Sequence, residues 1–366
     1  MRSVDCDTHF LEPLRLWVEY ADPAWRDAAP RLVADGGRLL LDVGGDLHPG
    51  SPTHAGFGSL YRPDGEVADG VCDLHAASVD PGRRLARLDR TGTEAEIIYP
   101  TAAMAGMHSI RDAEHAAAHA RAYNRFAAAV TAAAPDRLCA AMIVPLNHPI
   151  AAERELRHAR EHLGLGVLLA SFVAPSPYAL SDRELDRVWA AAADLDVTVT
   201  FQDSSLTAAA RTSGLARAQT WRMLYLAAHV VEAQLGLADI VLGGVLARHP
   251  TLRVGIAETH LRWISPWLSL LDDRFGARSD GGLPTQQFAR QCFVAAFPDD
   301  AGARELIDSL GAENLVFASD WPHTSLADGN ERDWVSTVSE RSDLQPHEVR
   351  QALVVNPRRW FPVSAP

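Results

Sequence analysis

Short runs of apolar and β-branched residues recur along the chain, and segments of helical length lie between them. The alternation is typical of parallel βα units, and eight such units close a (β/α)₈ barrel. The sequence therefore predicts an α/β fold of the TIM-barrel class. The expected strands are Ser3–Cys6, Ala95–Tyr99, Ala140–Val144, Gly166–Ala170, Val197–Phe201, Leu252–Ala257, Cys292–Phe297 and Leu315–Ala318.

Helical periodicity is clearest in residues 112–134 and 220–246. A third helix is expected to begin near Ser181, because Ser181 and Glu184 have the spacing of a capping box and an apolar stripe of Leu185, Val188 and Trp189 follows. These helices are expected to cover the outside of the barrel.

One interval breaks the short-loop pattern. About 85 residues separate Cys6 from Ala95, whereas most connections in compact domains have about 4–6 residues. We expect one domain over residues 1–366 with an inserted cap at about residues 13–80. The cap is expected to consist of loops and a small hairpin over the barrel mouth, because few helical periods and many glycines occur there: Gly36, Gly37, Gly44, Gly45, Gly50, Gly56 and Gly58.

Charge and hydropathy narrow the class of protein. The 366 residues carry a formal net charge of −13, which argues against a nucleic-acid groove because phosphate binding needs clustered Lys and Arg. No apolar run approaches the roughly 20 residues that span a bilayer, and the first residues lack the pattern of a signal peptide. Four scattered cysteines without a CxxC pair fit a reducing cytosol. We expect a cytoplasmic protein that acts on a small molecule.

Polar residues follow the first and last predicted strands, where a barrel gathers its active site. After the first strand, alternation places Asp7 and His9 on one side, and a carboxylate and an imidazole at this spacing can bind one cation. After the last strand, Asp320 stands where a ligand or general base is expected. Either motif alone is also typical of a capped turn, but the two strands become neighbours when the barrel closes. Glu12, Trp321 and His323 lie beside these motifs and are candidate substrate contacts.

Two other strand ends carry polar side chains. Gln202 ends the fifth predicted strand, and Glu258 and His260 follow the sixth. Glu258 is a candidate ligand, general base or orienting acid, with a solvated loop carboxylate as the plainer interpretation. His229 lies on an Ala-rich helix, where a core or capping role is as compatible with the pattern as substrate binding.

The chain resembles the amidohydrolase-related family that includes aminocarboxymuconate-semialdehyde, resorcylate and dihydroxybenzoate decarboxylases. The resemblance extends over nearly the whole length and rests on blocks in a fixed order: Asp7-Thr8-His9 with Leu11-Glu12-Pro13, Arg84-Leu85, Tyr99-Pro100-Thr101, Arg121 to Asn124, Gly243-Gly244-Val245, Glu258, Trp263 to Leu268, Leu271-Asp272 and Ser319 to His323.

The resemblance implies a divalent metal, commonly zinc or manganese, held by the equivalents of Asp7, His9 and Asp320 and by a histidine after the fifth strand. This chain has Gln202 at that last position. An oxygen-rich set with Gln202 as a weak ligand favours a harder ion such as manganese or magnesium. His260 is a possible source of the missing imidazole. The resemblance also implies a homodimer. The Ala- and Arg-rich composition is typical of bacteria with GC-rich genomes. In such bacteria, enzymes of this kind often serve catabolism or secondary metabolism.

Three functions remain open from the sequence. The first is a lyase or hydrolase, either a decarboxylase or an enzyme that opens an amide, ester or lactone, on a small carboxylated or cyclic substrate. Asp320 would transfer the proton in both. The second is a metal-independent lyase, cyclase or dehydratase that uses Asp320, Glu258 and His260. The third is a barrel without catalytic activity that binds a ligand or partner. The presence of Asp7, His9 and Asp320 at the strand ends argues against it.

Overall fold

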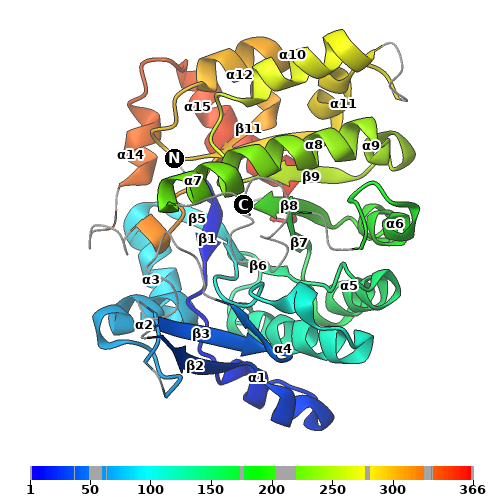
Figure 1. Ribbon diagram of the computed structural model, residues 1–366. Coiled ribbons are helices and arrows are strands. Elements are labelled where there is room, and N and C mark those ends of the chain that lie inside the picture. The colour runs from blue at the N-terminus through cyan, green and yellow to red at the C-terminus, as the bar shows by residue number, and fades with distance from the viewer. Residues whose placement is uncertain are drawn as a thin grey trace.

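The computed structural model describes residues 2–363 except 37, 49–59, 63, 174–176, 203–219, 277–280, 325–330 and 332. Eight parallel strands form one sheet whose spatial order follows the chain, and helices surround it (Figure 1). The predicted (β/α)₈ class is confirmed, and every predicted strand is present with its ends shifted by a few residues at most. The strands are β1 (Ser3–His9), β5 (Thr93–Tyr99), β6 (Leu138–Met142), β7 (Val167–Ser171), β8 (Thr198–Gln202), β9 (Arg253–Ile256), β10 (Cys292–Ala296) and β11 (Leu315–Phe317).

The barrel is nearly closed where β1 meets the chain that follows β11. Thr8 and Trp321 form an isolated parallel bridge there. The backbone N–H of His9 donates to the carbonyl of Trp321 (2.7 Å), and that of Asp320 donates to the carbonyl of Asp7 (2.9 Å). The bonds of this seam therefore involve the same residues that carry the polar strand-end motifs.

The helices follow the expected alternation, and both long segments of helical periodicity are helical. Residues 112–134 contain α4, and residues 220–246 contain α7, a π-helical turn (η9), α8 and the start of α9. The helices of the βα units are α4 (Ala113–Thr131), α5 (Pro149–Leu163), α6 (Asp186–Asp194), α7 (Trp221–Leu226), η9 (Ala227–Val231), α8 (Glu232–Leu242), α9 (Val245–Arg248), α10 (Ile264–Phe275), α11 (Pro284–Gln291), α12 (Ala303–Leu310), α14 (Trp334–Ser339), α15 (Pro346–Arg350), η12 (Gln351–Val355, π) and α16 (Asn356–Trp360), with short 3₁₀ turns η5 (Met107–Ser109), η6 (Arg183–Leu185) and η11 (Ala312–Asn314).

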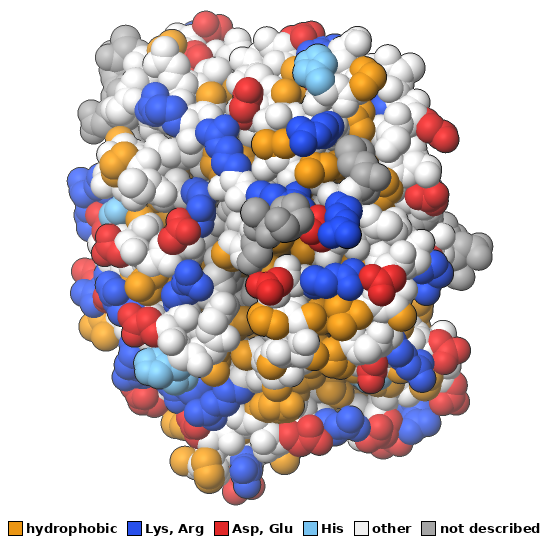
Figure 2. Space-filling view, turned by 180° about the vertical axis from the view of Figure 1, so that it is seen from behind, with side chains coloured by type: hydrophobic (Ala, Val, Ile, Leu, Met, Phe, Trp, Pro, Cys, Tyr) orange, Lys and Arg blue, Asp and Glu red, His pale blue; other side chains and the backbone are white. Residues whose placement is uncertain are grey.

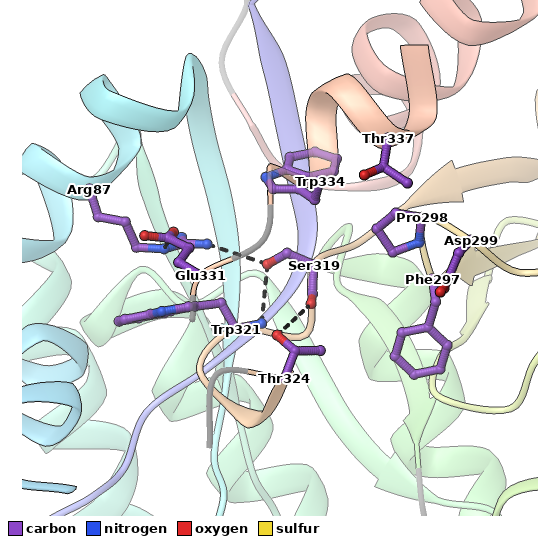
Figure 3. A pocket seen from close by; sticks show the side chains of 10 residues that line it. All are labelled: Arg87, Phe297, Pro298, Asp299, Ser319, Trp321, Thr324, Glu331, Trp334 and Thr337. Atoms are coloured by element: carbon purple, nitrogen blue, oxygen red, sulfur yellow. Dashed lines mark hydrogen bonds and ion pairs between the residues drawn. The ribbon is translucent and has the colours of Figure 1, made fainter. Parts of the chain in front are cut away.

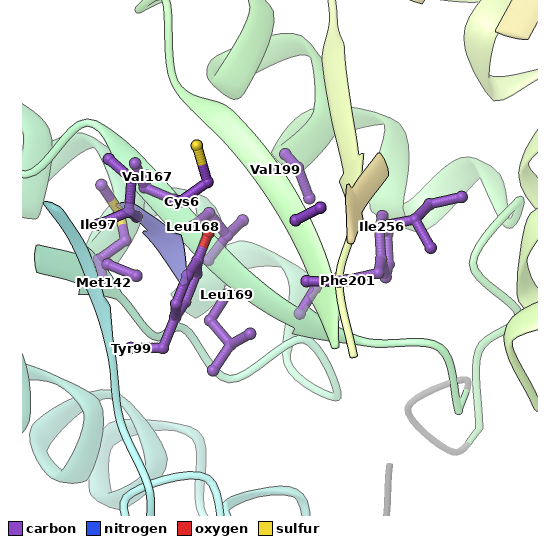
Figure 4. Packing of buried hydrophobic residues seen from close by; sticks show 14 of the residues in the cluster. Cys6, Ile97, Tyr99, Met142, Val167, Leu168, Leu169, Val199, Phe201 and Ile256 are labelled. Atoms are coloured by element: carbon purple, nitrogen blue, oxygen red, sulfur yellow. The ribbon is translucent and has the colours of Figure 1, made fainter. Parts of the chain in front are cut away.

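Side chains on both faces of the strands are buried, as expected for parallel strands covered by helices. The consecutive residues Val167, Leu168 and Leu169 of β7 are all buried (Figure 4). Gly255 of β9 leaves room for the ring of Phe293, because a Cβ at Gly255 would lie 2.3 Å from the Cζ atom of that ring. The rigid apolar core holds the strand ends in fixed positions.

Between β1 and β5 the chain is more regular than the expected loops and hairpin. It forms an antiparallel three-stranded sheet of β2 (Arg31–Asp35), β3 (Arg38–Val43) and β4 (Asp46–His48), with α1 (Leu16–Glu19), η1 (Pro23–Ala28), η4 (Asp69–Val71), α2 (Cys72–Val79) and α3 (Pro81–Thr91). This sheet contacts the loop after β5, since a Cβ at Gly106 would lie 2.4 Å from Nε2 of His48. Gly37, Gly50, Gly56 and Gly58 lie outside the described residues.

The surface seen from behind mixes acidic and basic side chains, and hydrophobic ones gather in the lower half of the view (Figure 2). Among the described residues, no helix has the length and apolar character needed to cross a membrane.

Candidate metal centre

Four side chains from three strand ends converge on one point. Nε2 of His9, the last residue of β1, lies 3.1 Å from Oδ1 of Asp7, 3.1 Å from Oε1 of Glu258 and 3.4 Å from Oδ1 of Asp320. One nitrogen or oxygen from each of the four lies within 4.8 Å of those of the others. We call Asp7, His9, Glu258 and Asp320 the carboxylate cluster. It combines three carboxylates with one imidazole.

The orientation of His9 is fixed from the other side of its ring. Nδ1 lies 3.1 Å from the carbonyl oxygen of Pro100, which can only accept a hydrogen bond. Nδ1 therefore carries a proton, and the Nε2 lone pair of a neutral His9 points at the carboxylates. Burial by itself would lower the pKa of His9. Asp7 and Glu258 raise it by more than burial lowers it, so the pKa lies well above its ordinary value. A proton or a metal ion between Nε2 and the carboxylates satisfies this geometry.

The pKa values of two of the carboxylates are raised as well. Burial raises the pKa of Asp7 to about 7, and Glu258 adds to the rise while His9 opposes it. Burial and the charge of Glu258 hold the pKa of Asp320 well above its usual range. Within the described part of the chain, Oδ1 of Asp7 and Oδ1 of Asp320 are buried and have no donor besides Nε2 of His9, which lies 3.1 and 3.4 Å away. Two buried acceptors, a third carboxylate and an imidazole nitrogen fit a divalent cation, and the predominance of oxygen favours a hard one.

Gln202 lies beside this cluster and donates a hydrogen bond to one of its carboxylates. Its Nε2 donates a 2.8 Å hydrogen bond to Oδ2 of Asp7, and the side chain is buried. The sequence suggested Gln202 as a weak metal ligand. The structure instead places its amide as a donor that fixes the carboxylate of Asp7, the kind of support that metal ligands usually have.

The backbone is strained at the same strand ends. Among the described residues, four that are not glycine have positive φ, and three of them are Glu258 (58°), His260 (59°) and Asp320 (54°). Such conformations cost about 1–3 kcal/mol each and gather at functional sites. The strain supports the assignment of this end of the barrel as the functional one.

His260 does not supply the imidazole that Gln202 replaces. Its Nδ1 lies 2.6 Å from Oδ1 of Asp300, and its Nε2 lies 2.8 Å from the hydroxyl of Tyr225. The hydrogen bond to Asp300 raises the pKa of His260 above its ordinary value. Both ring nitrogens are therefore engaged outside the carboxylate cluster.

His229 supports the main chain at the cluster. Its Nδ1 donates a 2.6 Å hydrogen bond to the carbonyl of Glu258, and its ring packs against Tyr225 with centroids 4.0 Å apart. His229 belongs to the π-helical turn η9. Of the roles left open by the sequence, which were core packing, capping and substrate binding, His229 caps no helix end: it is buried and holds the carbonyl of Glu258.

Glu12 and His323 lie on the loops around the cluster. Both carboxylate oxygens of Glu12 accept hydrogen bonds from the backbone N–H groups of Thr101, Ala102 and Ala103 (2.9–3.3 Å), so Glu12 ties the β1 loop to the β5 loop. The ring of His323 lies 4.2 Å from that of His9, and its Nε2 lies 3.1 Å from Oγ1 of Thr101. His323 is therefore next to the cluster, whereas Glu12 has contacts that hold the loop.

Trp321 does not face the cluster. Its buried indole lies against the guanidinium groups of Arg84 and Arg87, 5.1 and 4.3 Å from the ring centroid. Its expected role as a substrate contact in the barrel mouth therefore has no support from its contacts.

Two buried arginines, Arg84 and Arg87, were given no role from the sequence. Arg84 is fully buried, pairs with Glu96 (2.5 Å) and donates to the carbonyl of His9 (3.0 Å). Arg87 pairs with the other oxygen of Glu96 (3.2 Å). Charged residues on a short helix usually face water. The burial of these two arginines depends on residues that are distant in sequence, so the sequence alone did not indicate it.

Comparisons with known proteins agree with this architecture. The family model described as amidohydrolase matches residues 4–363. No curated protein matches the chain. Among solved structures, an amidohydrolase from Mycobacterium avium subsp. paratuberculosis K-10 is similar at 22% identity and a TM-score of 0.80, over 100% of this chain and 98% of that one.

Two further similar structures are 5-carboxyvanillate decarboxylases. The enzyme from Sphingomonas paucimobilis is 18% identical with a TM-score of 0.69, and 99% of each chain is covered. The enzyme from Novosphingobium aromaticivorans, solved with manganese and 4-hydroxy-3-methoxy-5-nitrobenzoic acid, is 15% identical with a TM-score of 0.72, over 98% of this chain and 96% of that one. These likenesses show the shared fold.

Because the family model extends over almost the entire sequence, the chain belongs to the amidohydrolase family and is an enzyme.

Proposed function

We propose that this enzyme is a metal-dependent decarboxylase of a small carboxylated cyclic compound. The observation that carries the proposal is the carboxylate cluster, in which two buried carboxylate oxygens face Nε2 of His9 and, among the described residues, have no other donor. Two decarboxylases of the same fold, one of them solved with manganese, add support.

The cluster residues would hold a divalent ion, with manganese favoured by the oxygen-rich donors. When bound, such an ion polarises a substrate carboxylate and a neighbouring oxygen. Pro100 holds His9 by its carbonyl, Gln202 holds Asp7, and His229 holds the backbone of Glu258. The chain therefore orients two of the four side chains, and the backbone of a third residue, through groups outside the cluster.

Asp320 is proposed to move the proton. Its side chain is 14% exposed, so a substrate in the mouth can reach it. Burial and the charge of Glu258 raise the pKa of Asp320 above its usual range, which suits a carboxyl group that gives up and takes back a proton. In decarboxylation, the bond between the ring carbon and the carboxylate breaks, CO₂ leaves, and the carbon takes the proton of Asp320. Solvent then returns a proton to Asp320.

Elemental analysis and a CO₂ assay test this proposal together. Protein purified without chelator is expected to hold about one equivalent of manganese or zinc. Incubated in D₂O with a panel of hydroxybenzoic acids, including 5-carboxyvanillate, it is expected to release CO₂ and place one deuterium on the carbon that loses the carboxylate. Asp320→Asn is expected to lower the turnover by at least about a hundredfold.

Asp196→Asn is the matched control, because Asp196 also has positive φ (56°) but its side chain is 74% exposed. Turnover that survives complete metal removal would instead support metal-independent acid–base chemistry by Asp320 and Glu258. Hydrolysis of amides, esters or lactones without CO₂ release would identify Asp320 as a residue that activates water.

A further inference from the structure

A second histidine lies against the carboxylate cluster. One ring nitrogen of His323, one of His9 and a carboxylate oxygen of Asp320 lie within 4.8 Å of one another. The ligands of one ion lie about 2.0–2.2 Å from it, so any two of them are at most about 4.4 Å apart. The three donors are therefore already near the spacing that one ion requires. We propose that His323 is a further ligand of the ion at this cluster, which then has two imidazole ligands. The proposal rests on the metal centre of the proposed function and specifies its donors.

The turn after β11 brings His323 to this position. The hydroxyl of Thr324 donates to the carbonyl of Ser319 (3.3 Å), and the backbone N–H of Trp321 donates to the hydroxyl of Ser319 (3.1 Å), as Figure 3 shows. The backbone N–H of Thr324 also donates to the carbonyl of Asp320 (3.3 Å). These bonds close the turn, so His323 is held near Asp320, which precedes it by three residues.

The hydrogen bonds of Thr101 decide which nitrogen of His323 can bind an ion. The Thr101 hydroxyl has one proton, which it donates to the carbonyl of Phe10 (2.6 Å). Its contact with Nε2 of His323 (3.1 Å) therefore needs the ring N–H as the donor. A neutral His323 then has its lone pair on Nδ1, which is buried. Nδ1 is thus the ligand atom.

His9 and His323 are oriented in the same way by neighbouring residues of the β5 loop. The carbonyl of Pro100 accepts from Nδ1–H of His9 (3.1 Å), and the hydroxyl of Thr101 accepts from Nε2–H of His323. Metal-binding histidines usually donate their second N–H to such an acceptor. The two rings meet edge to face with centroids 4.2 Å apart. Both imidazoles are therefore oriented by the chain itself.

The second imidazole bears on which ion the centre prefers. Mg²⁺ takes oxygen ligands, whereas imidazole is a ligand of transition metals. Gln202 adds no nitrogen donor, because its amide donates to Asp7 (2.8 Å). With His9 and His323 the centre has two nitrogen donors beside its carboxylates. We therefore expect His323 to strengthen the binding of Mn²⁺ and to contribute little to the binding of Mg²⁺.

Pulsed electron paramagnetic resonance of the Mn²⁺-loaded full-length protein tests the assignment, because it detects the nitrogens of imidazoles bound to Mn²⁺. We expect two imidazoles in the wild type and one in His323→Phe, which keeps a ring and removes both nitrogens. Equilibrium dialysis of the metal-free proteins should give a Mn²⁺ affinity at least about tenfold lower in His323→Phe. The Mg²⁺ affinity should change by less than about threefold.

His148→Phe is the matched control. His148 lies on the β6 loop at the same end of the barrel, and its Nε2 donates to the carbonyl of Ile110 (2.9 Å). This variant should retain two imidazoles on Mn²⁺ and the affinity of the wild type.

A wild-type spectrum with one imidazole, or a His323→Phe spectrum equal to that of the wild type, overturns the assignment. The wild-type spectrum needs no variant, so a His323→Phe chain that fails to fold leaves this test intact. A protein that holds Mn²⁺ through two imidazoles, one of them lost in His323→Phe, but releases no CO₂ supports the assignment and contradicts the decarboxylase. A wild type that binds no Mn²⁺ overturns both.

Discussion

At the residue scale, the candidate metal centre depends on one imidazole among three carboxylates. His9 and Asp7 are each held from outside the cluster, by Pro100 and by Gln202. A single hydrogen bond at such a place is worth more than its direct energy, because it sets where a ligand atom points.

Replacing Gln202 tests this support. In Gln202→Leu, Oδ2 of Asp7 loses its donor, so we expect the affinity for Mn²⁺ to fall about 10- to 100-fold. Thr200→Val is the matched control on the same strand, because Thr200 accepts its hydrogen bond from Tyr99 rather than contacting Asp7. Titration of metal-free protein measures both. Equal affinities in wild type and Gln202→Leu would show that Asp7 needs no such donor.

A buried histidine away from the cluster predicts a pH dependence of stability. His119 stacks on Trp17 with ring centroids 5.1 Å apart, and burial lowers its pKa from 6.5 to about 4. Between these values the unfolded chain binds a proton that the folded chain does not, so stability falls as pH falls below about 6.5. At pH 5 we expect this residue to have removed about 2 kcal/mol of the stability present at pH 8.

His119→Phe keeps the stacked ring and removes the titration. Urea unfolding at pH 8 and pH 5 should show a loss about 2 kcal/mol smaller than in the wild type. His347→Phe replaces an exposed histidine and is the control. A wild-type loss that persists unchanged in His119→Phe would mean that other groups cause it.

At the element scale, long-range contacts of polar side chains decide how loops are held. The capping box predicted at Ser181 does not form. The hydroxyl of Ser181 donates to Asp239 instead (2.5 Å), and the 3₁₀ turn η6 precedes α6. Glu12 acts similarly on the loop after β5. Both side chains satisfy groups that are distant in sequence.

Glu12→Ala is expected to destabilise the fold by about 3 kcal/mol or more, because three buried backbone N–H groups lose their acceptor. Glu12→Gln keeps one acceptor oxygen and should cost about half as much. Glu19→Ala, at an exposed carboxylate on α1, is the control and should change stability little. Urea unfolding measures all three, and a Glu12→Ala loss no larger than the control would contradict a structural role.

At the scale of the whole molecule, the seam between β1 and β11 joins fold and function. Asp5 accepts hydrogen bonds from the backbone N–H and the hydroxyl of Ser319 (2.8 and 2.7 Å), next to Asp320. Closing the barrel at this seam brings Asp320 next to Asp7 and His9, and Glu258 reaches them from the end of β9. The expected homodimer stays a prediction.

A bound cation should relieve this concentration of charge. Adding Mn²⁺ at about 100 times its dissociation constant is expected to stabilise the metal-free protein by about 2.7 kcal/mol. Metal-free Asp320→Asn should be more stable than the metal-free wild type at pH 8, because it removes a buried carboxyl whose pKa is raised by burial and by Glu258. It should gain little from Mn²⁺. Thermal unfolding measures both effects. If metal-free Asp320→Asn is less stable than the metal-free wild type, the Asp320 carboxylate does not destabilise the metal-free fold.

The sequence by itself determined the barrel and the members of β1 that face the cluster, because apolar runs and two-residue alternation are local properties. It also pointed to Glu258 and Asp320, since strand ends in a barrel share one mouth. Only the tertiary structure decided that Gln202 supports Asp7, that His260 pairs with Asp300, that Trp321 faces Arg84 and Arg87, and that those arginines are buried. These facts depend on which strands and loops become neighbours, and a side chain's partner across the barrel leaves no local pattern in the chain.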